Sequence, residues 1–200
     1  MNWNFECSPK NIALENGSLD ANLIKEITKV VPDHATWVVQ EKITGIGLGI
    51  SYNNEDEIRF CVRPEEYKNL PATFHLAEKA VIKIEDKIKK LFERAGAKKR
   101  MTIYGKIVSS PECDDNFYAF ALVVDDVIQE VYKYVGLFDE CDILFSQMLL
   151  IAPLNECLGT LPEKGFVSVC GEESIDEVLI QPNSPLYSED GWKIILKKQR

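Results

Sequence analysis

Residues 37–45 read WVVQEKITG, and this segment decides the fold that we expect. Its first part is rich in β-branched and aromatic residues, which favours a strand. The strand leads to Lys42 and then to Gly45, where we expect a turn in which the glycine adopts backbone angles that other residues avoid. Residues 47–52 alternate between apolar and small or polar types, so a second strand follows the turn.

The glycines at positions 45, 47 and 49 do not form a dinucleotide-binding loop. Such a loop has the pattern G-x-G-x-x-G, which closes a strand and opens a helix. Here strand-like residues follow the glycines instead. The spacing therefore indicates a turn between two strands.

The remaining elements predict an α+β domain. Apolar residues recur every three or four positions between residues 76 and 91, which predicts one helix that stops near Gly96. The apolar segment 138–150 is interpreted as a second helix, although its apolar content is nearly continuous. Further strands are expected at residues 57–62, 101–108, 117–124, 165–170, 177–180 and 192–196. This order predicts mostly antiparallel sheets with peripheral helices.

Composition limits the class of protein. The chain has 200 residues, 46% of them hydrophobic, so a single domain over residues 1–200 is expected. The net charge of -9 argues against binding nucleic acid by overall attraction, so any such contact is local. The six cysteines include no C-x-x-C pair, which indicates reduced thiols rather than a zinc site. No secretory signal or apolar run of roughly 20 residues is present, so we expect an intracellular protein without a membrane span, cytoplasmic or, in a eukaryote, nuclear.

The densest basic stretch lies between Lys83 and Arg100. Acidic residues are interspersed in it, which favours a solvated helix face. Together with the basic residues at the C-terminal end, it is also the best candidate for a local contact with a phosphate backbone.

Lys42 has two interpretations. A lysine at the end of a strand is commonly a solvated side chain. A lysine that is desolvated and close to other cations is instead a nucleophile, because its amine loses a proton more readily. With a nucleoside triphosphate, attack on the α-phosphate gives a lysyl phosphoramidate and releases pyrophosphate. A divalent metal ion and basic groups neutralise the phosphate charge.

Several segments, in the same order, resemble the signature motifs of the RNA ligases typified by the second phage RNA ligase and the trypanosome editing ligases. They are residues 37–45 (WVVQEKITG), 59–63 (RFCVR), 103–106 (IYGK), 117–120 (FYAF), 176–182 (DEVLIQP) and 192–198 (WKIILKK). The resemblance spans nearly the whole chain. It implies the nucleotidyltransferase (adenylation) fold of the ATP-grasp-like ligase type, with no appended C-terminal domain.

The resemblance also implies a site. Lys42 carries the covalent nucleotide, and Asp176 is the remaining carboxylate for a metal ion or for the nucleophile. The residues implied to bind the nucleotide are Glu41, Gly45, Arg63, Phe120 and Lys197. Among them, Phe120 stacks on the base, while Arg63 and Lys197 hold phosphates. ATP and Mg²⁺ or Mn²⁺ are the implied cofactors.

Four positions depart from the family pattern. Lys106 replaces a glutamate and so reverses a charge, and Glu177 replaces a glycine. Gln199 stands where the closing motif has its second lysine, and Gly47 replaces an asparagine that the family links to strand sealing. These changes predict lost activity or an altered metal dependence.

Three functions therefore stay open. The first is an ATP-dependent RNA ligase-like nucleotidyltransferase that forms lysyl-AMP and acts on the 5'-phosphate ends of RNA or of a nicked duplex, as in RNA repair. The second is a catalytically impaired homologue that binds a nucleotide, a nucleic-acid end or a protein partner. The third is a capping-type guanylyltransferase that uses GTP. A protein partner that supplies the grip on the substrate is a further candidate.

Overall fold

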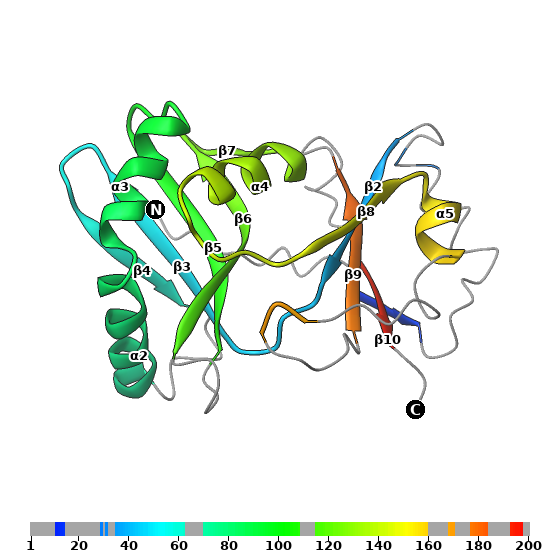
Figure 1. Ribbon diagram of the computed structural model, residues 1–200, viewed down its shortest axis with the longest axis horizontal. Helices are drawn as coiled ribbons and strands as arrows, with labels where there is room; N and C mark the ends of the chain where they lie inside the picture. The colour runs from blue at the N-terminus through cyan, green and yellow to red at the C-terminus, as the bar shows by residue number, and fades with distance from the viewer. Residues whose placement is uncertain are drawn as a thin grey trace. The chain divides into compact units, whose positions relative to one another are not determined.

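The computed structural model describes residues 11–14, 29, 31, 35–62, 70–108, 115–159, 168–170, 177–183 and 193–197. The chain divides into two compact units. Unit 1 comprises Met1–Lys42 and Gln147–Arg200, and unit 2 comprises Ile43–Ser146. Each unit contains one five-stranded sheet (Figure 1). The single domain predicted over residues 1–200 concerns both units together and stays a prediction.

The sheet of unit 1 combines strands from both ends of the chain. Its order is β1 (Asn11–Leu14), β10 (Lys193–Lys197), β9 (Glu177–Pro182), β2 (Trp37–Glu41) and β8 (Met148–Ala152). The pair β1–β10 is parallel, and the other pairs are antiparallel. The short helix α5 (Leu154–Gly159) contacts β2 and β8. Strand β2, which leads to Lys42, is thus paired on both edges, with β9 and with β8.

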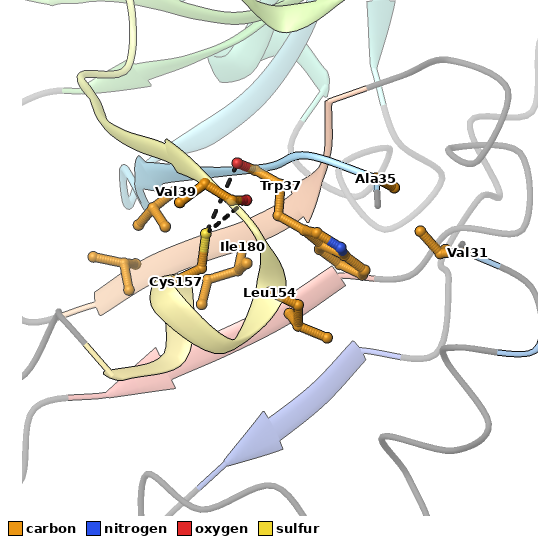
Figure 2. Close-up of a cluster of buried hydrophobic side chains, with 9 residues drawn as sticks. Val31, Ala35, Trp37, Val39, Leu154, Cys157 and Ile180 are labelled. Carbon is orange, nitrogen blue, oxygen red and sulfur yellow. Dashed lines mark hydrogen bonds between the residues drawn. The ribbon is translucent and has the colours of Figure 1, made fainter. Parts of the chain in front are cut away.

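A hydrophobic cluster forms the core of unit 1 (Figure 2). Trp37 and Val39 lie on one face of β2, beside Ile180 of β9. Leu154 and Cys157 of α5 cover them, and the Cys157 sulfur lies 3.8 Å from the carbonyl oxygen of Trp37. This packing fixes β2 against the helix.

The sheet of unit 2 is antiparallel throughout. Its order is β4 (Ile58–Val62), β3 (Ile46–Asn53), β5 (Arg100–Val108), β6 (Asn116–Val124) and β7 (Val127–Ile128). The helices of this unit are α2 (Leu70–Ile82), α3 (Glu85–Arg94) and α4 (Val131–Glu140). Helix α2 contacts β5 and β6, α3 contacts β3 and α4, and α4 contacts β6 (Figure 1).

Strand β3 has one face of large side chains and one of small residues. Leu48, Ile50 and Tyr52 alternate with Gly47, Gly49 and Ser51, so each set occupies its own face of the strand. The ring of Tyr52 meets the ring of Phe92 in α3 edge-on, with 5.2 Å between centroids. The helices therefore cover the face with large side chains, and the opposite face carries the glycines.

The predicted fold class is confirmed: the protein is α+β, with mostly antiparallel sheets and few helices. The strands expected around residues 36–62, 101–124 and 177–196 are present. The single helix expected near residues 76–96 is instead two helices, α2 and α3, separated by Lys83 and Ile84. The apolar period continues across this break, so periodicity alone does not reveal it.

The prediction of a helix over residues 138–150 is wrong. Helix α4 ends at Glu140, and residues 148–152 form strand β8. A short continuous apolar run fits a strand as well as a helix. Residues 168–170, expected to end a strand, form a turn, and residues 165–167 lie outside the described part. None of the described helices is long and apolar enough to cross a membrane.

Candidate nucleotide site around Lys42

Lys42 directly follows the buried strand β2. All five residues of that strand are buried, whereas Lys42 is half-buried and Ile43 is buried again. Unit 1 gives way to unit 2 between these two residues. The lysine is therefore held at the end of a rigid element, as a positioned nucleophile requires.

Gly45 makes the turn after Lys42 possible, but not in the expected way. Among the described glycines, only Gly96 has a positive φ, so the prediction of unusual backbone angles at Gly45 is wrong. A Cβ atom at Gly45 would instead lie 2.3 Å from the carbonyl oxygen of Ile107. The glycine is required because the turn passes against the backbone of β5.

Lys106 holds the same turn. Its ammonium nitrogen donates a hydrogen bond to the carbonyl oxygen of Gly45 across 3.1 Å. In the register of β3 and β5, Lys106 pairs with Gly47. Two of the four departures from the family pattern are thus direct neighbours, and one of them holds the backbone three residues beyond Lys42.

Glu41 is a buried carboxylate with partners inside unit 1. The Ser168 hydroxyl donates to one of its oxygens, and the Val169 amide donates to the other across 3.2 Å. The Cys170 amide in turn donates to the Ser168 hydroxyl oxygen across 3.0 Å. Glu41 therefore anchors the turn at residues 168–170, and its contact with a nucleotide stays a prediction.

Phe120 lies at a bulge in β6. Tyr104 pairs with Ala121 and Gly105 pairs with Ala119, so Phe120 has no opposite residue on β5. Its carbonyl oxygen accepts a hydrogen bond of 2.7 Å from the Tyr134 hydroxyl in α4. The bulge inserts one extra residue into β6 at Phe120, so the strict alternation of faces along a strand does not hold there. Its stacking on a base stays a prediction.

The other predicted site residues are only partly covered by the structure. Arg63, Asp176 and Gln199 lie outside the described residues. The backbone register places Lys197 on β10 opposite Glu177 on β9. Within the described residues, no group of three or more His, Cys, Asp and Glu side chains could hold a metal ion.

Sequence reasoning missed Gln40. This side chain is 1% exposed, and its Oε1 atom accepts a hydrogen bond of 2.7 Å from Nε2 of Gln181 on β9. Its own Nε2 atom is buried without a hydrogen-bond partner. The available signal was an amide side chain directly after three apolar residues of the strand, two residues before Lys42.

The basic stretch is largely engaged within unit 2. The ammonium groups of Lys87 and Lys90 donate to the carbonyl oxygens of Asp142 and Glu140, at 2.7 and 2.6 Å, where α4 ends. Cations at the C-terminal end of a helix are favourable because that end carries partial negative charge. These two lysines therefore fasten α3 to α4, which favours the structural interpretation of the stretch.

We compared the chain with protein families, curated proteins and solved structures. The sequence matches no protein-family model and no curated protein. Solved structures of RNA ligases do match. An archaeal ATP-dependent RNA ligase aligns with 95% of the chain at a TM-score of 0.60 and 14% identity. The chain has the fold of ATP-dependent RNA ligases.

Other matches are structures of the Naegleria gruberi RNA ligase. Its complex with pyrophosphate aligns with 92% of the chain, at a TM-score of 0.57 and 12% identity. An arginine-to-alanine mutant of the same ligase, solved with ATP and Mn, aligns with 89% of the chain, at a TM-score of 0.56 and 13% identity. The chain spans 48% of the archaeal ligase and 57% and 53% of these two Naegleria chains, about half the length of the ligases it matches.

Proposed function

We propose that this protein is an ATP-dependent RNA ligase-like nucleotidyltransferase that forms lysyl-AMP on Lys42 and acts on the 5'-phosphate ends of RNA. The observation that carries the proposal is the position of Lys42. It stands at the end of a buried strand, before a turn held by Gly45 and Lys106, in a chain with the fold of RNA ligases. Support for ATP and a divalent metal comes from the Naegleria ligase solved with ATP and Mn.

The proposed reaction begins at the Lys42 amine. The uncharged amine attacks the α-phosphorus, a P–N bond forms, and the bond between the α- and β-phosphates breaks. Pyrophosphate leaves with the electron pair of that bond, and the amine loses a proton to solvent. In the second step an oxygen of the strand's 5'-phosphate attacks the same phosphorus and a P–O–P linkage forms. The P–N bond breaks, and the lysine amine leaves with that electron pair and takes up a proton from solvent.

Residues of the chain itself position the Lys42 amine and supply positive charge near it. Lys42 is held by β2, and Lys106 adds a cation beside the turn. A divalent metal ion, when bound, neutralises phosphate charge in such reactions. No metal ligand is assigned here, because the described residues contain no group of carboxylates that would hold one.

Covalent labelling tests the proposal. The protein is incubated with α-labelled ATP and Mg²⁺ or Mn²⁺, denatured, and examined for protein-bound label. We expect label on the wild type and on Lys79→Ala, a matched control at an exposed position of α2, and none on Lys42→Ala. Label that persists in Lys42→Ala overturns the proposal. A parallel reaction with labelled GTP tests the capping-type alternative.

The second candidate is a homologue that binds a nucleotide or a nucleic-acid end without catalysis. Lys106 favours it, because a lysine occupies a position where the resembled family has a carboxylate and its ammonium is bonded to Gly45. In this case ATP binds, as measured by calorimetry, but no covalent label appears with either metal. Where the wild type does take up label, addition of nicked and single-stranded RNA to the labelled enzyme separates adenylylation from strand sealing.

A further inference from the structure

We propose that the exposed face of α2 binds the same face of a second copy of this chain, with the two helices antiparallel. The proposed interface belongs to unit 2 and does not depend on nucleotidyl transfer. Three features of α2 support it: two exposed apolar side chains in one row along the helix, the order of these side chains before binding, and the charges that lie between them.

The first feature is the apolar row. Phe74 is 50% exposed and Ile82 is 71% exposed, so they are two of the three most exposed large apolar residues in the described part of the chain. Glu78 stands midway between them, and the three residues recur at intervals of four along one ridge of α2. The residues that α2 buries are Ala77, Ala80 and Val81. Single exposed apolar residues are common, but apolar residues gathered on one face mark a contact surface.

The second feature is that both apolar side chains are ordered before a partner binds. The ring of Phe74 meets the ring of Phe60 in β4 edge-on, with 5.4 Å between centroids. Ile82 is β-branched, and such a side chain has one strongly preferred rotamer in a helix. Side chains that are already ordered lose little entropy on association, so a small surface of this kind binds better than its area alone indicates.

The third feature is charge. Glu78 and Lys79 are both exposed, and neither forms an ion pair with another described residue. The chain has a net charge of -9, which opposes contact between two copies over most of the surface. One acid and one base side by side offset each other, so this face of α2 is suited to a contact between like chains.

The spacing of these residues is self-complementary. When helices pack by their ridges, the row of Phe74, Glu78 and Ile82 lies in the groove beside the same row of the other helix, next to the neighbouring row that contains Lys79. About a two-fold axis near Glu78, the antiparallel arrangement places Phe74 against Ile82 of the second copy at both ends of the contact. Glu78 then lies beside Lys79 of the second copy, and two carboxylates alternate with two ammonium groups around the axis.

The antiparallel direction is favoured by the helices themselves. It brings the positive N-terminal end of each helix beside the negative C-terminal end of the other, whereas a parallel pair places like ends together. A contact made by one helix from each copy is smaller than the usual stable interface. The dimer is therefore expected to be reversible and to depend on protein concentration.

Analytical ultracentrifugation from micromolar to millimolar concentration tests the interface. We expect the wild type to change from monomer to dimer as its concentration rises. Ile82→Glu places a charge in the apolar contact at both ends and is expected to weaken dimerisation about 10-fold or more. The matched control is Val127→Glu, which changes an apolar side chain that is 58% exposed on β7 of the same unit. It is expected to dimerise as the wild type does.

Charge exchange tests the pairing around the axis. Glu78→Lys and Lys79→Glu each gather like charges there, and each is expected to weaken dimerisation about 3- to 10-fold. The double variant Glu78→Lys/Lys79→Glu restores the alternation and is expected to dimerise as the wild type does. Both positions are exposed, so circular dichroism is expected to show the same fold in all three variants.

Cross-linking tests the direction of the helices. Phe74→Cys and Ile82→Cys are mixed at a concentration where the wild type is dimeric, and the mixture is oxidised. Peptide mapping by mass spectrometry then identifies which disulfides have formed. The antiparallel arrangement predicts links between the two variants, and links that join each variant only to itself overturn it.

The remaining outcomes are also decisive. A wild type that stays monomeric up to millimolar concentration overturns the proposal. A dimer that Ile82→Glu leaves intact overturns it too, because the two copies then meet through another surface. Single charge variants that dimerise as the wild type does, or a double variant that does not recover, rule out the alternation of charges around the axis. None of these results bears on the labelling of Lys42, because no nucleotide is present.

Discussion

Lys106 lies directly opposite Gly47 in the antiparallel register of β3 and β5. Both positions depart from the pattern of the resembled RNA ligases, and their adjacency gives the departures one physical explanation. Gly47 has no side chain to obstruct the lysine, and the Lys106 ammonium reaches back to the Gly45 carbonyl oxygen at 3.1 Å. At this pair a half-buried lysine therefore takes the place of a carboxylate and holds the turn after Lys42.

The two positions are expected to be energetically coupled. Lys106→Glu removes the hydrogen bond to the Gly45 carbonyl oxygen, which is solvent-exposed, and should lower the free energy of unfolding by about 0.5 to 1.5 kcal/mol. Gly47→Asn alone crowds the lysine and should cost about 1 to 3 kcal/mol. The double variant should cost less than the sum, with a coupling of about 0.5 to 3 kcal/mol, because the introduced amide donates to the introduced carboxylate. Urea unfolding of the wild type, the two single variants and the double variant measures this coupling energy. Strictly additive losses of stability would contradict the predicted coupling.

Substitution by alanine is expected to change the stability of the protein in opposite directions at Gly45 and Gly136. Gly45→Ala places a methyl group 2.3 Å from the Ile107 carbonyl oxygen, so it should destabilise unit 2 by about 1 to 3 kcal/mol. Gly136 lies inside α4 with nothing within 4 Å of an added Cβ atom. Gly136→Ala should therefore stabilise the protein by about 0.5 to 1 kcal/mol, since alanine favours the helix. Thermal unfolding measures both changes, and equal signs would count against the close approach at Gly45.

Periodicity and turn chemistry predicted most strands, because apolar alternation and glycine turns are local features of the sequence. Residues 37–45 therefore indicated both β2 and the position of Lys42. The role of Gly45 was mistaken because its reason is a contact with β5, far along the chain, which no local pattern encodes. The same holds for the bulge at Phe120 and for the partners of Glu41.

Asp125 gives a pH-dependent contribution to stability. The backbone amides of Arg100, Lys98 and Lys99 donate to its carboxylate and hold its pKa below the usual value. A lowered folded-state pKa stabilises the protein above the unfolded-state pKa, about 3.9, and this contribution is lost as the pH falls through the folded-state pKa. Asp125→Asn, which tolerates the left-handed backbone there, should thus be less stable than the wild type at neutral pH. The difference should shrink in acid. A difference that stays constant across the acid range would show that the charge is not responsible.

Cys157 is expected to be chemically inert in the folded protein. Burial raises the pKa of its thiol to about 11, and the residue is 0% exposed on the side of α5 that packs against β2. Cys170 is half-buried and should react much faster with iodoacetamide at mildly alkaline pH. Peptide mapping by mass spectrometry compares the two rates, with protein unfolded in guanidinium as the control in which they converge. Equal rates in the native protein would rule out the packing in Figure 2.

The most direct test of the account is to locate the nucleotide on the chain. After reaction with ATP and a divalent metal ion, the protein is digested and the peptide that carries AMP is identified by mass spectrometry. We predict a single adduct on Lys42, in the peptide that contains β2, and none on Lys106. An adduct on Lys106 or on any other lysine, or no adduct with any metal ion tested, would contradict it.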